Sequence, residues 1–239
     1  MEKEFKIRTP DKKIIYGKLR GSLSKPVIIS VHGLGSTMDD AIHYNAARYF
    51  EKNGFASFIF NLYDWRKGAR KMLDCSLKRH GKDIDTVTKF LKRKGTKKIF
   101  ILGHSYGAPA ILCSEYKNYK AVVFWDGSFV EFSARFFKQD IRLRQIKARF
   151  SRWGSLTGER MVQEAFKFDT LKYLVKLNMP IKFIAAGKGI LTPYEKKMYK
   201  AVKVQKALKV IAGASHNFTE GGMQEKLYKE TLSWFKKFV

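Results

Sequence analysis

The stretch KKIFILGHSYGAPAILCSEY, residues 97–116, decides how the rest of the chain is interpreted. The apolar run at residues 99–102 is typical of a buried strand, and the apolar residues after the pentapeptide G-H-S-Y-G (103–107) have helical spacing. A G-x-S-x-G pattern between a strand and a helix predicts a sharp turn with a serine hydroxyl at its tip. The two flanking glycines lack Cβ atoms, so the strand and the helix can approach each other closely around Ser105.

Strands alternate with helices on both sides of this turn. Residues 4–8 and 13–19 alternate apolar and polar side chains around an Asp-Lys pair, which predicts a β-hairpin. Further strands are predicted at residues 27–31, 56–61, 121–125, 181–186 and 207–211, and helices at 37–53, 77–94, from 192 onward and at 220–238. This alternation predicts an α/β protein with a mostly parallel sheet and crossover helices.

The alternation is interrupted between residues 128 and 178. Phenylalanine and aliphatic residues recur at steps of three and four from Phe129 to Phe150, which predicts an amphipathic helix, and a second helical segment ends near Leu174. We therefore expect residues 1–127 and 179–239 to form a core domain, with residues 128–178 as a helical lid inserted in it.

The chain is strongly basic, with a formal net charge of +27 over 239 residues. A basic surface can attract nucleic acid, an anionic membrane or an acidic substrate. The lysines and arginines are spread from end to end without a nucleic-acid motif, so we expect a solvated basic surface rather than a nucleic-acid binder. Peripheral contact with anionic lipid stays open, and the sequence does not indicate an oligomeric state.

Several features favour a cytoplasmic location. Residues 1–13 lack the apolar segment of a signal peptide, and no apolar run reaches membrane-spanning length. The two cysteines, Cys75 and Cys113, give no disulfide framework and are compatible with a reducing compartment.

The chain resembles the α/β-hydrolase family over essentially its whole length. Four landmarks occur in the family's order: His32-Gly33 after a strand, the turn at 103–107, an insertion after Asp126, and G-A-S-H (213–216) after the last strand. Within the family it is most similar to small-lid carboxylesterases of the monoacylglycerol-lipase and cinnamoyl-esterase types. The resemblance implies a mostly parallel sheet of about eight strands flanked by helices. It also implies a serine hydrolase that cleaves short-chain acyl, monoacylglycerol-like or aryl esters through an acyl-enzyme.

The resemblance also assigns roles to residues, because acyl transfer needs a nucleophile, a base, a group that orients the base, and donors to the oxyanion. Ser105 fits the nucleophile and His216 the base. The backbone N–H groups of Leu34 and Tyr106 fit the oxyanion donors. Of the other histidines, we expect His104 to be structural, His32 to shape the loop that contains Leu34, and His43 and His80 to be solvated on helices. No cofactor or metal is implied.

The acid departs from the common pattern of the family. Many relatives carry G-x-x-D after the penultimate strand, whereas this chain has G-K-G-I at residues 187–190. We expect Asp126, at the tip of the preceding strand, to orient His216, because this keeps the chain order Ser, Asp, His. The alternatives are Asp169 in the lid, Glu195, which also fits a helix-capping pattern, and a site without an acid.

Two other functions are compatible with the sequence. A thioesterase or amidase would use the same residues. A non-catalytic binding protein on a hydrolase scaffold would explain the missing carboxylate after Gly187 and the basic charge.

Overall fold

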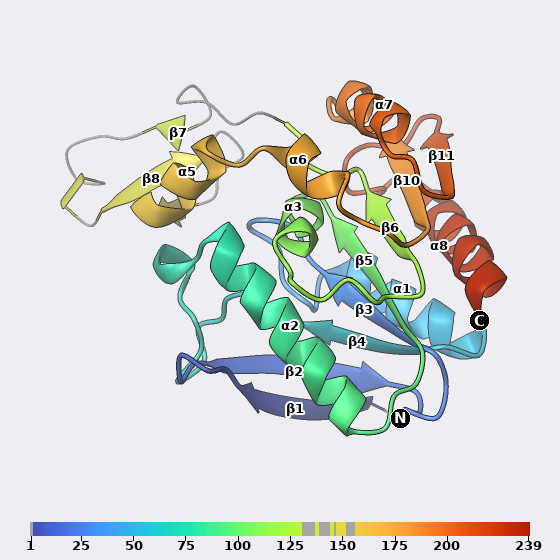
Figure 1. The fold of residues 1–239 in the computed structure, drawn as a ribbon, viewed down its shortest axis with the longest axis horizontal. Coiled ribbons are helices and arrows are strands. Elements are labelled where there is room, and N and C mark those ends of the chain that lie inside the picture. Colours follow the sequence, from blue (N-terminus) through green and yellow to red (C-terminus); the bar gives the residue numbers. More distant parts are fainter. Residues whose placement is uncertain (1, 131–136, 139–143, 146, 152–155) are drawn as a thin grey trace.

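The computed structural model describes residues 2–130, 137–138, 144–145, 147–151 and 156–239. Eight strands form one sheet with the order β1-β2-β4-β3-β5-β6-β10-β11 (Figure 1). The pairs β1–β2 and β2–β4 are antiparallel, and all the other neighbours are parallel. The strands are β1 (Glu2–Arg8), β2 (Ile14–Arg20), β3 (Val27–Val31), β4 (Ala56–Phe60), β5 (Ile99–His104), β6 (Val122–Trp125), β10 (Ile181–Ala186) and β11 (Lys206–Ile211).

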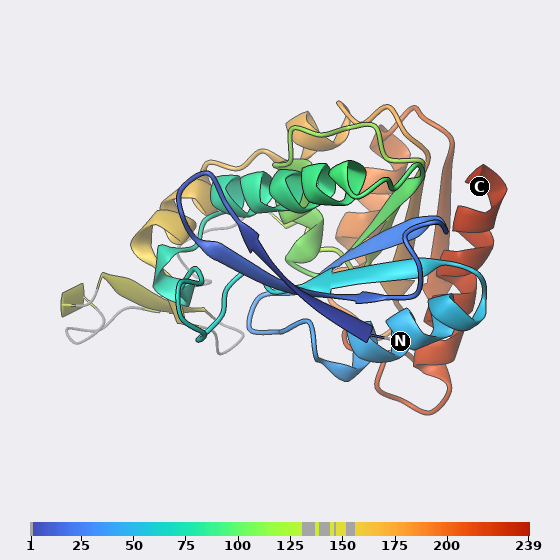
Figure 2. The ribbon, with the colours of Figure 1, turned by 90° about the horizontal axis from the view of Figure 1, so that it is seen from below.

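Helices cover both faces of this sheet, as Figures 1 and 2 show from two directions. One face carries α2 (Leu77–Arg93), α3 (Gly107–Leu112), α6 (Thr170–Leu174) and α7 (Thr192–Ala201). The other face carries α1 (Ala41–Lys52) and α8 (Met223–Phe235), which a short helix η3 (Lys236–Phe238) follows. The helix α1 begins later than the predicted residue 37, because Thr37 Oγ1 bonds to Asp40 Oδ1 at 3.0 Å in a turn that precedes the helix.

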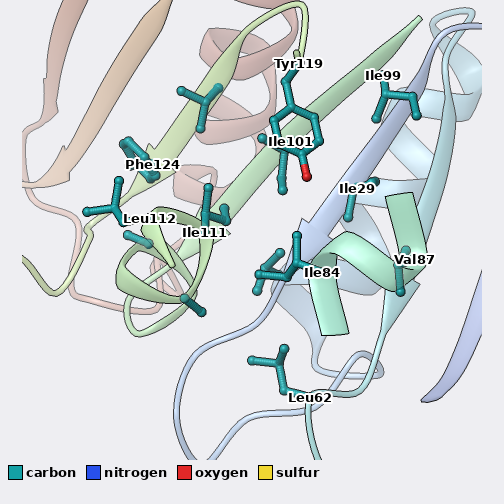
Figure 3. Packing of buried hydrophobic residues seen from close by; sticks show 14 of the residues in the cluster. Ile29, Leu62, Ile84, Val87, Ile99, Ile101, Ile111, Leu112, Tyr119 and Phe124 are labelled. Carbon is teal, nitrogen blue, oxygen red and sulfur yellow. The ribbon is translucent and has the colours of Figure 1, made fainter. Parts of the chain in front are cut away.

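A hydrophobic cluster lies on each face of the sheet, and the strands contribute to both because successive side chains of a strand point to opposite faces. Ile101 of β5 packs under α2 and α3, in the cluster drawn in Figure 3, whereas the next residue, Leu102, belongs to the cluster under α1 and α8. Ile29 and Ile28 of β3 divide in the same way. Strands buried on both faces explain the continuous apolar runs of the sequence.

The segment after β6 differs from its prediction. Among the described residues, β7 (Phe137–Lys138), β8 (Ala148–Ser151) and β9 (Leu156–Gly158) form a small antiparallel sheet, whereas residues 144–145 are helical. The amphipathic helix predicted up to Phe150 is therefore wrong at β7 and at the residues of β8 up to Phe150. Other residues of that predicted helix, 131–136, 139–143 and 146, lie outside the described residues. Aromatic residues suit strands as well as helices, and short apolar patterns do not separate the two. The second predicted helical segment is present as α5 (Glu159–Phe166) and α6.

Candidate active site

Ser105 lies at the tip of the tight turn between β5 and α3. Its φ of 52° is in the left-handed region, which is uncommon for a residue with a side chain. Two backbone hydrogen bonds hold this conformation. The Ser105 N–H donates to the Trp125 carbonyl at 3.0 Å, and the Ser105 carbonyl accepts from the Ser128 N–H at 3.0 Å. The end of β6 and the residues after it therefore fix the serine in place.

The two glycines of the pentapeptide lie so close to other backbone atoms that neither position has space for a Cβ atom. A Cβ atom on Gly103 would lie 2.7 Å from the carbonyl carbon of Gly107. A Cβ atom on Gly107 would lie 2.3 Å from the carbonyl oxygen of Val31. Because neither backbone can move aside, the turn predicted around Ser105 can form only with glycine at both positions.

His216 and Asp126 meet at the edge where the parallel strands end. His216 Nδ1 lies 2.6 Å from Asp126 Oδ2, and the other oxygen, Oδ1, accepts from the Ala186 N–H at 3.0 Å. The Asp126 side chain is fully buried, whereas that of His216 is 40% exposed. With Nδ1–H held by the carboxylate, the imidazole presents Nε2 as its free acceptor. Asp126, the acid expected from the sequence, is thus the carboxylate bonded to His216.

The Ser105 hydroxyl is bonded to Ser128 rather than to His216. Its Oγ lies 3.2 Å from the hydroxyl of Ser128, and no hydrogen bond among the described residues joins it to His216. Both Ser105 and His216 line the same cavity. Catalytic hydrogen bonds are often long in unliganded enzymes and tighten only when substrate is bound.

The two expected oxyanion donors also line this cavity. Tyr106 follows Ser105, and Leu34 lies in the loop after β3. In the described part of the chain, no acceptor is bonded to either backbone N–H. Two N–H groups beside a serine hydroxyl match what a developing oxyanion needs.

His32 and His104 are buried and hold loops of the site together. His32 Nδ1–H donates to the Gly33 carbonyl at 2.8 Å, and its Nε2 accepts from the Leu62 N–H at 3.0 Å. His104 Nε2–H donates to the His216 carbonyl at 3.0 Å. Burial lowers the pKa of His32 to about 4 and that of His104 to about 3, so both are neutral near pH 7.

The expectation that His43 and His80 are solvated is wrong. His43 is 1% exposed and its Nδ1 lies 2.8 Å from Ser30 Oγ; His80 is fully buried and its Nδ1 lies 2.8 Å from the Tyr106 hydroxyl. Each lies on the helix face that packs on the sheet, where a hydroxyl group bonds to Nδ1, whereas Nε2 is buried with no hydrogen-bond partner among the described residues. The sequence pattern gave no sign of these partners.

The alternative acids have other contacts. Asp169 caps α6 by accepting from the Lys172 N–H at 3.0 Å. Glu195 Oε1 accepts from the Gly127 N–H at 2.6 Å, and Oε2 is buried without a hydrogen-bond partner among the described residues. Burial raises the pKa of Glu195 well above its ordinary value and so favours the protonated form of this side chain. The interpretation of Glu195 as a helix-capping residue is therefore wrong.

The cavity at this site has a volume of about 700 Å³. Its walls are mostly apolar and include Leu77, Met161, Ala165, Ile190 and Leu191. Met161 and Ala165 belong to α5, in the segment after β6. This combination of apolar walls and a few convergent polar groups is typical of a small-molecule site. Within the described ranges, no group of three or more His, Cys, Asp or Glu side chains is placed to hold a metal ion.

Two residues of the site were not identified from the sequence. Ser128, which bonds to the Ser105 hydroxyl, follows the D-G dipeptide and has no distinguishing pattern. Gly189 was noted only as part of a stretch without a carboxylate, yet a Cβ atom there would lie 2.8 Å from Asp126 Oδ2. The available signal in the sequence was a glycine shortly after β10, the strand that pairs with β6 and so ends beside Asp126.

Comparisons with known proteins bear on the fold. No protein-family model and no curated protein matches the chain. Est1E from Butyrivibrio proteoclasticus, solved with ferulic acid bound, is 18% identical with a TM-score of 0.83 over 98% of each chain. The esterase Pf2001 of Pyrococcus furiosus is 20% identical with a TM-score of 0.76 over 100% of this chain and 93% of that one. A monoacylglycerol lipase of Paleococcus ferrophilus is 16% identical, with a TM-score of 0.70 over 94% of this chain and 99% of that one.

The chain therefore has the α/β-hydrolase fold, and the fold class predicted from the sequence is confirmed.

Proposed function

We propose that the protein is a serine hydrolase that cleaves carboxylic esters through an acyl-enzyme intermediate. The observation that carries this proposal is the hydrogen bond between the buried Asp126 and His216, because His216 lines the same mostly apolar cavity as Ser105. An imidazole oriented by a buried carboxylate has the geometry of a general base for a hydroxyl nucleophile. The structural neighbours named above as esterases and a monoacylglycerol lipase support the same reaction class.

In the acylation step, the Ser105 hydroxyl turns from Ser128 toward His216 and attacks the ester carbonyl carbon. His216 Nε2 takes the serine proton, and Asp126 holds Nδ1–H and stabilises the imidazolium that forms. The oxyanion of the tetrahedral intermediate accepts from the N–H groups of Leu34 and Tyr106. Collapse of the intermediate breaks the C–O bond of the ester, and the leaving alkoxide takes its proton from His216.

In the deacylation step, a water molecule replaces the alcohol. His216 takes a proton from this water as the hydroxide attacks the carbonyl of the acyl-Ser105. The second tetrahedral intermediate uses the same two N–H groups, and its collapse releases the carboxylic acid and returns the proton to Ser105 Oγ.

The apolar cavity favours an uncharged acyl or aryl group on the substrate. We infer that residues 128–178 act as a lid, because Met161 and Ala165 of α5 line the cavity together with residues of the core. Est1E has ferulic acid bound, which supports an aryl acid among the acyl groups that this cavity accepts. A cavity of about 700 Å³ holds a molecule of that size with room for a small alcohol.

The test is an assay of p-nitrophenyl acetate and p-nitrophenyl butyrate with the wild-type protein and Ser105→Ala. We expect turnover by the wild type and a loss of at least about a thousandfold in the variant. Ser22→Ala, which changes an exposed serine far from the cavity, serves as the matched control and should keep wild-type turnover. Equal background rates for wild type and Ser105→Ala would refute the proposal. Preferred turnover of acyl-CoA thioesters or anilides would assign the same site to thioesters or amides.

A further inference from the structure

Basic side chains line the edge of the sheet at which the parallel strands begin. An exposed lysine lies within five residues before each of the six strands that run parallel, β4, β3, β5, β6, β10 and β11 (Figure 1). We call these residues the basic edge: Lys52, Lys25, Lys98, Lys120, Lys176 and Lys203. The sequence showed the lysines as dispersed, and the fold gathers these six.

The backbone shows that lysines of the basic edge are neighbours in space. The Val27 N–H, two residues after Lys25, donates to the Lys98 carbonyl at 2.9 Å. The Lys120 N–H donates to the Ile99 carbonyl at 2.9 Å, next to Lys98. Adjacent strands lie about 4.8 Å apart, so the backbones of these lysines are separated by about a Debye length or less.

Among the described residues, the carboxylates form their ion pairs with cations other than the lysines of the basic edge. In the described part of the chain, none of the ion pairs includes a lysine of the basic edge, whereas Lys18, Arg20 and Lys182 each pair with a carboxylate. Glu51, beside Lys52, pairs with Arg20 at 3.1 Å. Several unpaired like charges therefore repel one another along this edge.

Helix ends explain only part of this arrangement. Cations in the last turn of a helix interact favourably with its dipole, which accounts for Lys52 of α1 and for Lys92 and Arg93 of α2. Lys98 and Lys120 lie one and two residues before β5 and β6, outside the last turn of any helix, so stabilisation within a helix's own last turn does not account for them. A surface that keeps such charges together against their repulsion is suited to a polyanionic partner.

We propose that the basic edge is a docking surface for an anionic membrane, where it binds the phosphate groups of acidic phospholipids. The lysines of the basic edge are compact point charges without the planar fork that favours defined phosphate geometry. The surface is the broad end of a sheet with helix ends on both sides, and the large cavity lies at the opposite edge. Exposed lysines spread along a whole sheet edge match a planar layer of charged headgroups better than a groove that tracks a nucleic-acid strand.

This docking leaves the candidate active site free. Ser105, Asp126 and His216 all follow the carboxyl ends of strands, at the edge opposite to the basic edge (Figure 1). A protein docked by the basic edge presents the cavity to the aqueous phase. The membrane is then an anchor rather than the source of substrate, and docking does not depend on ester hydrolysis.

The test is sedimentation of the full-length protein with vesicles of phosphatidylcholine alone and of phosphatidylcholine with phosphatidylglycerol in equal parts. We expect binding only to the anionic vesicles, and weaker binding as salt increases. The triple variant Lys25→Glu/Lys98→Glu/Lys120→Glu should bind at least about a hundredfold more weakly.

The matched control is Lys67→Glu/Lys196→Glu/Lys226→Glu, which has the same net charge but changes exposed lysines outside the basic edge. It should bind within a few-fold of wild type, and circular dichroism should show that both variants are folded. Equal weakening by both variants would refute the basic edge as the docking surface, and so would absence of vesicle binding by the wild type. Tighter binding to duplex DNA than to anionic vesicles would assign the partner to nucleic acid and overturn the proposal.

Discussion

Gly189 leaves the space that the carboxylate of Asp126 occupies. A Cβ atom on Gly189 would lie 2.8 Å from Asp126 Oδ2, which is the oxygen bonded to His216 Nδ1 at 2.6 Å. The loop after β10 thus holds no carboxylate of its own and makes room for one from the end of β6. The absence of a carboxylate from the G-K-G-I stretch is therefore explained by Asp126, which supplies the carboxylate from the end of β6 and needs the space at Gly189.

Gly189→Ala should therefore lower kcat/KM by about ten- to a hundredfold, because the methyl group displaces the carboxylate from His216. Steady-state kinetics with p-nitrophenyl butyrate measure this loss. Gly221→Ala is the matched control, since a Cβ atom on Gly221 meets no atom within 4 Å. Wild-type kinetics for Gly189→Ala would show that Asp126 does not need this space.

Asp126→Asn should reduce kcat by about three to four orders of magnitude. The amide still accepts from the Ala186 N–H through Oδ1, but it turns an N–H group toward His216 Nδ1 and favours the wrong tautomer. Asp169→Asn, which alters a helix cap far from this hydrogen bond, should stay near wild-type turnover. The opposite ranking of the two variants would move the role of the acid to Asp169.

Glu195 should matter as a hydrogen-bond acceptor and not as a charge. Glu195→Gln keeps an acceptor for the Gly127 N–H and should preserve both stability and kcat. Glu195→Leu leaves that buried N–H unpaired, and the free energy of unfolding should fall by about 1–3 kcal/mol. Because Gly127 follows Asp126, kcat should fall as well while KM changes little. Urea unfolding and steady-state kinetics measure the two effects, and loss of kcat in Glu195→Gln would contradict this role.

Acid should destabilise the fold through its buried histidines. Burial lowers the pKa of His32 to about 4 and of His104 to about 3, and it lowers the pKa values of His43 and His80 well below the ordinary value. The unfolded chain, with histidine pKa values of about 6.5, binds more protons than the folded chain below that pH. Stability is therefore complete above about pH 6.5 and is lost as the pH falls toward 3 to 4, by about 2 kcal/mol per histidine at about pH 5.

Urea unfolding between about pH 7 and pH 5 measures this loss. His104→Gln keeps a donor for the His216 carbonyl but cannot titrate, so the slope of unfolding free energy against pH should be smaller by up to one proton. A stability that does not change between these pH values would contradict the neutral, buried state of the four histidines.

The sequence predicted the architecture well where the pattern was local. The sheet strands lie within two residues of their predicted positions, because short apolar runs between turn residues are distinctive in an α/β chain. The turn at Ser105 was equally predictable, because the close approach of strand and helix requires glycine at residues 103 and 107. The segment after β6 was less predictable, because recurrent phenylalanines suit a helix and a strand alike.

Features that depend on contacts between distant segments were not predictable. His43 and His80 are buried on helix faces that pack on the sheet, and Ser30 and Tyr106, which bond to their Nδ1 atoms, are not adjacent to them in sequence. The contact of Glu195 with Gly127 also joins residues far apart in the chain. Asp126 was expected from its position at a strand tip, but the space that Gly189 provides became visible only in the fold.

The most direct test of the central claim is covalent labelling with a fluorophosphonate, followed by mass spectrometry that locates the adduct. The account predicts one adduct, on Ser105 Oγ, that forms at least about a thousandfold more slowly in His216→Ala and is absent in Ser105→Ala. A folded wild-type protein that stays unlabelled at Ser105, or that labels at the same rate without His216, would contradict it.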